Sequence, residues 1–396
     1  MSDINLSERV QRIKPSPTLA ITSKAAELRA QGKDIIGLGA GEPDFDTPDH
    51  IKQAAIEAIN AGKTKYTAVD GTPGLKAAII EKFKRDNALD YQPGQILVSC
   101  GGKQSFFNMA LALLNDGDEA IIPAPYWVSY PDMVKVAGGV PVVLETDVNS
   151  RFKITPEQLE EAITPATRLF VINSPSNPSG MAYTKDELAA LGEVLKKYPR
   201  IVIATDDMYE HILWTGQPFV NIVNACPELY DRTVVMNGVS KAYSMTGWRI
   251  GYVGGPQKLV AAMKKVQSQS TSNPASISQA AAEAALTGDQ QCVANMVKAF
   301  KQRHDYVVDA LNKLPGVTCA AGDGTFYAFP DFSQAIARMD GVDSCTDLAA
   351  QLLETAEVAL VPGSAFGAPG CLRLSFAVGL DTLKEAIRRI EQALSK

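Results

Sequence analysis

The 396-residue sequence has few of the residues that commonly bind metals. It contains only three histidines, His50, His211 and His304, and its six cysteines lie far apart with no Cys-x-x-Cys pair. Structural and catalytic zinc sites draw on closely spaced cysteines and histidines. We therefore expect no metal site, and we interpret the cysteines as reduced thiols of a cytoplasmic protein.

Long apolar runs and clustered positive charge are also missing. No stretch approaches the roughly 18 apolar residues of a membrane span. The first residues, MSDINLSERVQRIKP, contain no apolar core of a secretory signal. Lysines and arginines are scattered, and the formal net charge is -6. These features favour a protein that binds neither membrane nor nucleic acid.

Short apolar, β-branched runs alternate with amphipathic segments along most of the chain. Strands are expected at 95–100, 118–125, 139–147, 167–173, 200–207 and 232–238, with helices at 103–115, 129–138 and 184–198 between them. Thr184 and Glu187 have the spacing of a helix capping box. Because the strands read as apolar on both faces, the pattern predicts an α/β fold with a mostly parallel sheet flanked by helices.

The pattern changes after about residue 290. A long helical stretch (293–314) is followed by three short strand candidates (324–330, 358–363, 371–377) and a closing helix from residue 380. We interpret 46–290 as a large cofactor-binding domain and 291–396 as a small α/β domain. Residues 1–45 are expected to form an N-terminal arm and part of the small domain, since chain ends commonly meet in two-lobed enzymes.

Polar and aromatic residues follow five of the expected strands. In open parallel sheets, ligands bind beyond the carboxyl ends of the strands. The residues at these positions therefore predict one shared site; they are Gly101, Gly102, Lys103, Trp127, Asn177, Asp206, Tyr209, Ser240 and Lys241.

Lys241 lies in the segment VSKAYSMTGWRIGY, among small and apolar residues, with Arg249 as the next cation. An isolated lysine is usually a solvated surface residue. Here it follows a buried strand and Ser240, and an amine held in a water-poor pocket near another cation loses its proton readily. Such an amine is suited to forming a Schiff base with an aldehyde.

Asp206 ends the strand of IVIATDDMYEH. It could be a helix N-cap, but Asp207 could serve that purpose and leave Asp206 facing the site. A carboxylate there can keep a ring nitrogen protonated, as in pyridoxal-phosphate chemistry. Tyr209 follows at about one helical turn and could hydrogen-bond the phenolic oxygen of such a cofactor.

Three further segments suit ligand contacts, although each could be purely structural. The prolines and glycine of NSPSNPSG fix the backbone around Asn177. The glycines of SCGGKQS allow backbone amides to approach an anion at a helix start, or form a simple tight turn. Trp127, in a proline-rich loop, could present a stacking face or belong to the core.

Two other motifs each allow two interpretations. GLGAGEPDF, which contains Gly41, resembles half of a dinucleotide fingerprint, but Glu-Pro-Asp follows where a helix should start. We expect a flexible loop near the substrate instead. Arg373, in the strand candidate CLRLSFA, is suited to bidentate pairing with a substrate carboxylate, or to a surface salt bridge.

The segments SKAYSMTGWRIGY, NSPSNPSG, DDMYEH and LRLSFA, in this order and spacing, resemble the fold-type I pyridoxal-phosphate aminotransferases of class I. The resemblance covers nearly the whole chain. AGEPDFDTP, GKTKYT, GGKQ and PYWVSYP make it closer to the bacterial Iβ-subgroup aspartate aminotransferases. It implies pyridoxal 5'-phosphate as cofactor, transamination between amino acids and 2-oxo acids, and a homodimer.

The resemblance also implies roles for individual residues. Lys241 would bond to the cofactor and carry the Cα proton, Asp206 would pair with the ring nitrogen, and Tyr209 and Asn177 would bind the phenolic oxygen. The remaining roles are ring stacking by Trp127, phosphate binding by Gly102, Lys103, Ser240, Arg249 and the neighbouring subunit's Tyr66, and substrate binding by Arg373, Gly41, Trp127 and Asn177. Gly238 stands where many relatives have serine, so one phosphate hydroxyl is expected to be missing.

Substrate choice is less constrained by the motifs. In close relatives a lysine at the Lys103 position and the segment around Lys14 and Ser16 help to bind a distal carboxylate. Desolvated anions need partners, so these cations favour a dicarboxylate. Aspartate with 2-oxoglutarate is the first expectation, prephenate the second, and aromatic or alanine transamination the third.

Two other classes remain as alternatives. A pyridoxal-phosphate lyase or synthase would use the same lysine. A non-enzymatic regulator on this fold would carry a DNA-binding segment, and the roughly 35 residues before IIGLGAGEP are too few and not basic enough for one.

Overall fold

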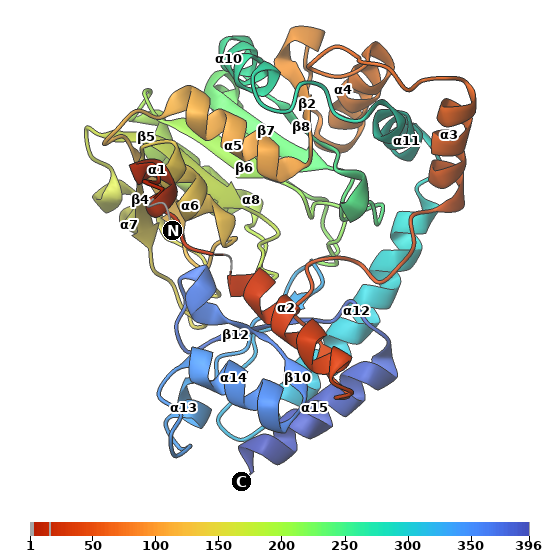
Figure 1. Cartoon of the computed structure of the whole chain (residues 1–396). Coiled ribbons are helices and arrows are strands. Elements are labelled where there is room, and N and C mark those ends of the chain that lie inside the picture. Colours follow the sequence, from red (N-terminus) through yellow and green to blue (C-terminus); the bar gives the residue numbers. More distant parts are fainter. Residues whose placement is uncertain (1–3, 16, 396) are drawn as a thin grey trace.

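A seven-stranded sheet forms the core of the larger part of the molecule in this computed structural model, which describes residues 4–15 and 17–395. In spatial order its strands are β2 (Ile96–Ser99), β8 (Gly251–Gly254), β7 (Thr233–Gly238), β6 (Val202–Asp206), β5 (Thr167–Asn173), β3 (Glu119–Pro123) and β4 (Val140–Leu144). The neighbours from β7 through β4 pair in parallel, whereas β8 is antiparallel to β2 and β7. The predicted α/β class with a mostly parallel sheet is confirmed (Figure 1).

Helices cover both faces of this sheet. One face packs against α5 (Gly102–Leu113), α6 (Ser129–Val136) and α10 (Gln257–Ser268). The other packs against α3 (Asp49–Asn60), α4 (Pro73–Asn87), α7 (Pro156–Ala162), α8 (Lys185–Lys196), α9 (Ile222–Ala225) and α11 (Ser276–Thr287). Short 3₁₀ turns are η1 (Pro93–Gln95), η2 (Pro227–Arg232) and η3 (Thr246–Trp248). The capping box expected at Thr184 and Glu187 is present and starts α8.

Two features of the sheet differ from the sequence prediction. Strand β8 was not predicted, because the glycine-rich GYVG offers little apolar pattern, yet all four of its residues are buried. Strand β4 was predicted to be apolar on both faces of a buried sheet. It is an edge strand instead. It pairs only with β3, and Val140 and Val143 are exposed.

The smaller part of the molecule is built from the chain's end. It contains α12 (Gln291–Leu311), β9 (Tyr327–Ala328), α13 (Ser333–Ile336), α14 (Cys345–Thr355), β10 (Val358–Ala359), β11 (Val361–Pro362), η4 (Gly363–Phe366), β12 (Leu372–Ser375) and α15 (Leu380–Leu394). Strands β11, β12 and β9 form an antiparallel sheet. One apolar core joins α12, α14 and α15 with β9, β10 and β12. The predicted strands are present but shorter than expected.

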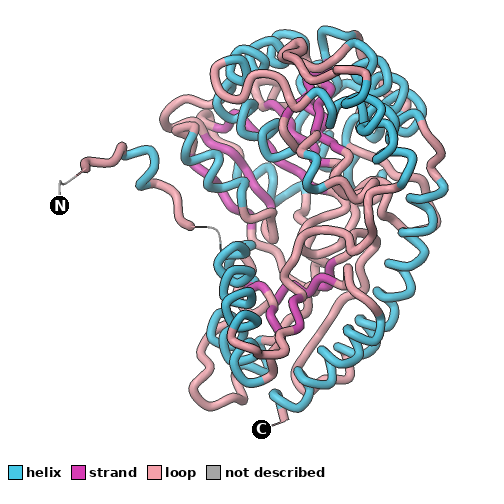
Figure 2. The backbone as a smooth tube through the Cα atoms, turned by 45° about the vertical axis from the view of Figure 1, so that its right-hand side comes forward, coloured by secondary structure: helices cyan, strands magenta, loops and turns pink. Residues whose placement is uncertain are grey.

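The N-terminal region reaches both parts of the molecule. Helix α2 (Pro17–Ala30) lies on β10 and β11, and β1 (Ile36–Gly37) pairs in parallel with β10. Residues 4–15, with α1 (Glu8–Gln11), extend outward in Figure 2, while α1 contacts α6 and Arg12 Nη1 lies 3.8 Å from Asp116 Oδ1. The domain boundaries at 45 and 290 stay a prediction. Within the described ranges, no helix combines the length and apolarity needed to cross a membrane.

Candidate active site

A cavity of about 360 Å³ opens at the carboxyl ends of β5, β6 and β7. Its size falls within the range of small-molecule sites. Loops from the large sheet and residues of the small part line it; they are Gly41, Glu42, Gly102, Lys103, Trp127, Val128, Ser129, Asn173, Asn177, Asp206, Met208, Tyr209, Ser240, Lys241, Thr246, Arg249, Tyr327 and Arg373. Four cations and two carboxylates belong to this set, so the cavity suits an anionic ligand.

Eleven residues predicted from the sequence meet in this one cavity; they are Gly41, Gly102, Lys103, Trp127, Asn177, Asp206, Tyr209, Ser240, Lys241, Arg249 and Arg373. Two others do not. Tyr66 is 92% exposed and Lys14 is exposed, and neither lines the cavity. Ser16, named with Lys14, lies outside the described residues.

Lys241 follows β7 and points its amine at the loop before α3, donating a hydrogen bond to the carbonyl of Gly41. The rings of Tyr209 and Phe326 have centroids 6.0 and 5.9 Å from Nζ. Burial, followed by the nearby Arg373, lowers the pKa of Lys241 to about 8. A substantial fraction of the amine is therefore neutral near physiological pH, as the sequence argument anticipated.

Asp206 ends β6 with its carboxylate in the cavity. Its Oδ1 accepts a hydrogen bond from the Met208 amide at 3.3 Å, and its Oδ2 accepts one from the hydroxyl of Tyr130. Burial raises the pKa of Asp206, an effect opposed by the Tyr130 hydrogen bond and by the charge of Lys241. A carboxylate in this setting is suited to pairing with a protonated ring nitrogen.

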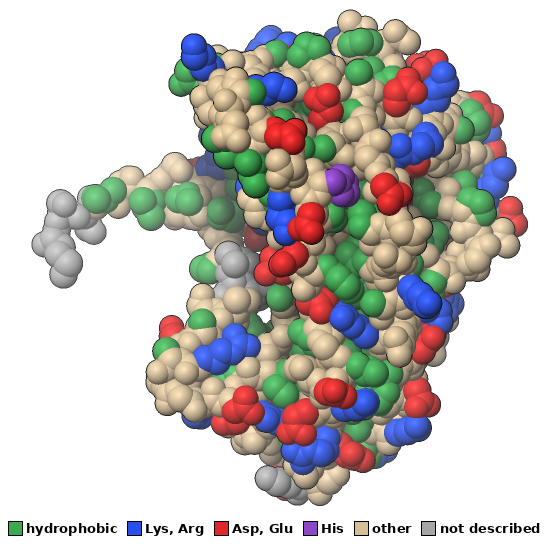
Figure 3. All heavy atoms as spheres, turned by 90° about the vertical axis from the view of Figure 1, so that its right-hand side faces the viewer, with side chains coloured by type: hydrophobic (Ala, Val, Ile, Leu, Met, Phe, Trp, Pro, Cys, Tyr) green, Lys and Arg blue, Asp and Glu red, His purple; other side chains and the backbone are tan. Residues whose placement is uncertain are grey.

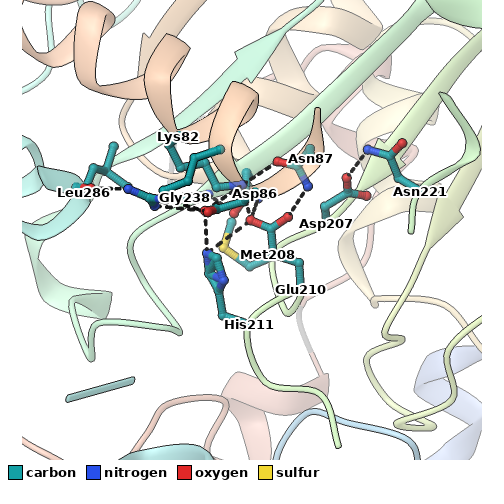
Figure 4. A network of polar contacts seen from close by, with 12 residues as sticks. Lys82, Asp86, Asn87, Asp207, Met208, Glu210, His211, Asn221, Gly238 and Leu286 are labelled. Atoms are coloured by element: carbon teal, nitrogen blue, oxygen red, sulfur yellow. Dashed lines mark hydrogen bonds and ion pairs between the residues drawn. The ribbon is translucent and has the colours of Figure 1, made fainter. Parts of the chain in front are cut away.

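The suggestion that Asp207 caps a helix was wrong. Residues 208–211 form a turn rather than a helix, and the Asp207 side chain is buried, accepting hydrogen bonds from Thr205 at 2.6 Å and Asn221 at 2.8 Å. Figure 4 shows it pointing to Asn221. Burial raises the pKa of Asp207 to about 7. Asp207 therefore anchors the turn that carries Asp206 and Tyr209 into the cavity.

A second set of polar contacts holds the same turn (Figure 4). Lys82 of α4 and Glu210 form an ion pair with side chains only 1% and 2% exposed. Asn87 and Asn237 also donate to the Glu210 carboxylate, at 2.7 and 2.8 Å. A buried carboxylate needs this many partners, and together they fix the backbone one residue beyond Tyr209.

Asp86, Glu210 and His211 offer ligand atoms close enough to one another to hold a metal ion, the one such group among the residues described. Lys82 already donates to Glu210, and Arg85 pairs with Asp86 through two hydrogen bonds. Two cations thus occupy the carboxylate oxygens that a metal would need. We assign the group to structural ion pairing.

Arg373 of β12 is buried, which rules out the surface salt bridge considered from the sequence. Its Nη1 donates to Asn177 Oδ1 at 2.9 Å and its Nη2 donates to the carbonyl of Gly39 at 2.8 Å. Its Nε is buried without a hydrogen-bond partner. An unpaired donor on a buried guanidinium is costly unless a ligand supplies the acceptor.

The opposite end of the cavity is formed by the start of α5. The amides of Gly102 and Lys103 belong to the first helical turn, whose N–H groups lack partners within the helix. Gly101 has a φ of +89°, and a Cβ there would lie 2.1 Å from Arg249 Nη2, so only glycine lets Arg249 approach. A helix N-terminus beside a guanidinium is suited to a phosphate group.

Gly238 does not line this end of the cavity. A Cβ at this position would point at the Ile250 carbonyl and the methyl group of Met208, each at 3.0 Å. A serine here would need Met208 to move. The expected loss of a phosphate contact at Gly238 stays untested.

Several cavity residues were not identified from the sequence. Tyr327 lies under the Arg373 guanidinium, 4.5 Å from ring centroid to Cζ, and its hydroxyl is 3.0 Å from that of Tyr209. Glu42 accepts a hydrogen bond from Thr246 at 2.8 Å. The strand-end rule covered only the large sheet, and Tyr327 reaches the cavity from the small part. Glu42 lies in the GEPDF motif and could have been found there.

The chain resembles proteins of known sequence and structure over almost its full length. A family model described as aminotransferase class I and II matches residues 33–390. An aspartate/prephenate aminotransferase of Nitrosomonas europaea is 63% identical, covering 99% of this chain and 100% of that protein. An aspartate aminotransferase of Geobacillus stearothermophilus is 53% identical over 98% of both chains.

Solved structures agree with this. The aspartate aminotransferase of Rhizobium meliloti superposes with a TM-score of 0.96 at 49% identity, covering 99% of both chains. The Thermus thermophilus aspartate aminotransferase, solved with maleate, has a TM-score of 0.93 at 42% identity and covers 98% of this chain and 100% of that one.

Proposed function

Since this chain belongs to the family of class I and II aminotransferases, we propose that it transfers the amino group of L-aspartate to 2-oxoglutarate by a ping-pong reaction. The observation that carries the proposal is the pairing, in one cavity, of a lysine amine whose pKa is lowered to about 8 with a buried arginine that has an unpaired Nε. The first suits proton transfer at carbon, and the second suits capture of a carboxylate.

The cofactor of this family is pyridoxal 5'-phosphate, and the residues present fit it. A dianionic phosphate matches the α5 N-terminus with Arg249, Lys103 and Ser240, where only glycine fits at position 101. When bound, the cofactor supplies an electron sink for the carbanion formed at the substrate Cα. We propose that Asp206 holds the ring nitrogen protonated, that Trp127 stacks on the ring, and that Tyr209 and Asn177 hold its phenolic oxygen.

Lys241 is proposed to move the Cα proton. With a pKa of about 8, roughly a quarter of the amine is neutral at pH 7.5, compared with about one in a thousand for an ordinary lysine. The neutral amine can accept a proton, and the rings of Tyr209 and Phe326 lie beside it. Substitution of Lys241 by alanine is therefore expected to abolish turnover.

Two cations suit a substrate with two carboxylates. We propose that Arg373 binds the α-carboxylate through its guanidinium and that Lys103 binds the distal one. Lys103 Nζ lies over the Trp127 ring, 5.1 Å from its centroid, and no carboxylate of the described residues forms an ion pair with it. The Thermus relative was solved with maleate, a dicarboxylate. Lys14 is exposed and does not line the cavity. For Lys14 to help bind the distal carboxylate, the N-terminal segment would have to approach the cavity.

Prephenate is a second candidate substrate. The Nitrosomonas relative at 63% identity is an aspartate/prephenate aminotransferase. Prephenate also carries two carboxylates, so the same two cations could bind it. The cavity would then have to accept a ring attached to the carbon that carries the distal carboxylate.

We further propose a cytoplasmic homodimer that serves amino-acid biosynthesis, with Tyr66 contributing to the neighbouring subunit's phosphate site. Tyr66 is 92% exposed, and Ile4, Leu6 and Val10 on the projecting N-terminal segment are also exposed. Figure 3 shows apolar side chains along that segment. Apolar side chains that project from the body in this way suit burial against a second copy.

A half-reaction screen tests the proposal. Purified protein is loaded with pyridoxal phosphate and mixed with aspartate, glutamate, alanine, phenylalanine or arogenate while the cofactor absorbance is followed. Fast bleaching by aspartate and glutamate supports the dicarboxylate assignment. Equal bleaching by arogenate or phenylalanine moves the assignment to prephenate or aromatic substrates, and full turnover by a Lys241→Ala variant contradicts the mechanism.

A further inference from the structure

Tyr130 is a fully enclosed residue whose hydroxyl reaches the cavity carboxylate. It lies in the first turn of α6, is 1% exposed, and does not itself line the cavity. Its ring packs against Phe106 at 4.8 Å and lies edge-on to Trp127 at 5.2 Å between ring centroids. Packing against these two rings holds the Tyr130 ring in place, with its hydroxyl directed at Asp206.

The two oxygens of Asp206 are differently engaged. Oδ1 accepts only a long 3.3 Å bond from the Met208 amide, whereas Oδ2 accepts the Tyr130 hydroxyl. Asn173 of β5 donates to the backbone carbonyl of Asp206 at 2.8 Å and not to its carboxylate. Tyr130 is therefore the side-chain donor that both orients this carboxylate and stabilises its negative charge.

The negative charge of Asp206 needs the hydrogen bond from Tyr130. The titratable groups that act on Asp206 are Tyr130 from α6 and Lys241 from the loop after β7. Tyr209 of its own turn lines the same cavity, whereas the Asp207 side chain is directed to Thr205 and Asn221. Burial favours the neutral acid, and the Tyr130 hydrogen bond and the charge of Lys241 oppose it. A neutral Asp206 could not hold a ring nitrogen protonated, because it would itself carry the shared proton.

We propose that Tyr130 is a positioning residue that keeps Asp206 ionised and aimed into the cavity, so that Asp206 can pair with the cofactor ring nitrogen. The inference rests on the proposed role of Asp206. Tyr130 would then influence the electronic state of the bound cofactor through Asp206, without contacting the cofactor itself. The hydroxyl, rather than the aromatic ring, carries this effect.

The test is a pH titration of cofactor absorbance in the loaded enzyme, with Tyr130→Phe compared to wild type. A protonated ring nitrogen withdraws electrons from the bond between cofactor and Lys241 and lowers the pH at which that bond loses its proton. Loss of the Tyr130 hydroxyl should therefore raise the titration midpoint by about one pH unit, a tenfold change in the equilibrium. The dissociation constant for pyridoxal phosphate should rise about tenfold as well.

Tyr183→Phe is the matched control. Tyr183 is a buried tyrosine of the same part of the chain, and its hydroxyl accepts a bond from the Ile154 amide at 3.0 Å, outside the cavity. The control should lose thermal stability to a similar degree and keep the wild-type midpoint. A Tyr130→Phe midpoint equal to that of the control would overturn the inference and leave Tyr130 a packing residue.

Two further variants separate the possible causes. In an Asp206→Asn background, Tyr130→Phe should add no shift, because asparagine does not ionise; an equal shift in both backgrounds overturns the inference. If Tyr130→Phe does not fold, 3,5-difluorotyrosine at position 130 preserves the packing and strengthens the donor, so the midpoint should fall. Absence of a cofactor absorbance band in the wild-type protein would instead contradict the proposed function, and the inference with it.

Discussion

Arg373 Nη1 donates a hydrogen bond to Asn177 Oδ1 over 2.9 Å, joining β12 of the small part to the loop after β5 of the large sheet. The pair fixes the guanidinium plane and leaves Nε without a partner. The arginine is therefore oriented before substrate arrives, and orientation is what a planar fork adds to a simple positive charge.

Arg373→Lys should consequently keep the charge and lose the geometry. We expect KM for every amino acid and oxo acid to rise by about 10- to 100-fold, since a charged hydrogen bond contributes roughly 1.5–3 kcal/mol. Steady-state kinetics with aspartate, alanine and phenylalanine check this. A rise in KM limited to aspartate would instead indicate that Arg373 binds the distal carboxylate.

Lys103→Ala should discriminate between substrates. KM for aspartate and 2-oxoglutarate is expected to rise about tenfold or more, with alanine and phenylalanine changed by less than about threefold, because only a second carboxylate loses its partner. The backbone amide proposed to hold phosphate is retained in this variant. Lys258→Ala, at an exposed position on α10, is the control. Equal losses for all substrates would assign Lys103 to cofactor binding alone.

The lowered pKa of Lys241 predicts a pH-dependent stability of the cofactor-free protein. The unfolded chain binds this proton up to a pKa near 10.5 and the folded chain only up to about 8, so folding is disfavoured below pH 8 and recovers between pH 8 and 10.5. Lys241→Met should therefore stabilise the apoprotein by about 2–3 kcal/mol at pH 7 and by much less at pH 10. Urea unfolding at both pH values measures this difference, and a gain that does not depend on pH would contradict it.

Removing only one partner of the Lys82–Glu210 ion pair should lower the stability of the folded protein strongly. Lys82→Met leaves the Glu210 carboxylate buried with its cation gone, which costs about 3–5 kcal/mol for pairs of this kind. Lys301→Met removes an exposed i,i+4 pair with Asp305 on α12 and should cost less than about 1 kcal/mol. Chemical denaturation of both variants tests the contrast, and similar costs would refute it.

Subunit mixing tests the position proposed for Tyr66. Tyr66→Ala and Lys241→Ala should each be poorly active, but a mixed dimer would contain one site with both residues intact. Random reassortment places half of the chains in mixed dimers, so about a quarter of wild-type activity should return; this figure follows from the closed two-fold symmetry of a dimer. No recovery after unfolding and refolding the mixture would mean that Tyr66 does not act across subunits.

The sequence by itself determined the fold class and most of the cavity. Apolar runs of β-branched residues forced the buried parallel strands, and because parallel strands end at one edge, residues as far apart as Gly102, Asn177, Asp206 and Lys241 had to meet. Sequence pattern also identified Arg373, although its burial was not decided from sequence. These inferences needed only local periodicity and one topological rule.

Tertiary structure alone decided the rest. Strand β8 depends on its neighbours for its pairing, since GYVG has too little apolar pattern to specify a strand. The partners of Asp206 and Glu210 come from helices distant in sequence, Tyr130 on α6 and Lys82 on α4. A hydrogen bond between side chains requires an exact distance and direction, and those are set by how the helices pack on the sheet, which no local pattern specifies.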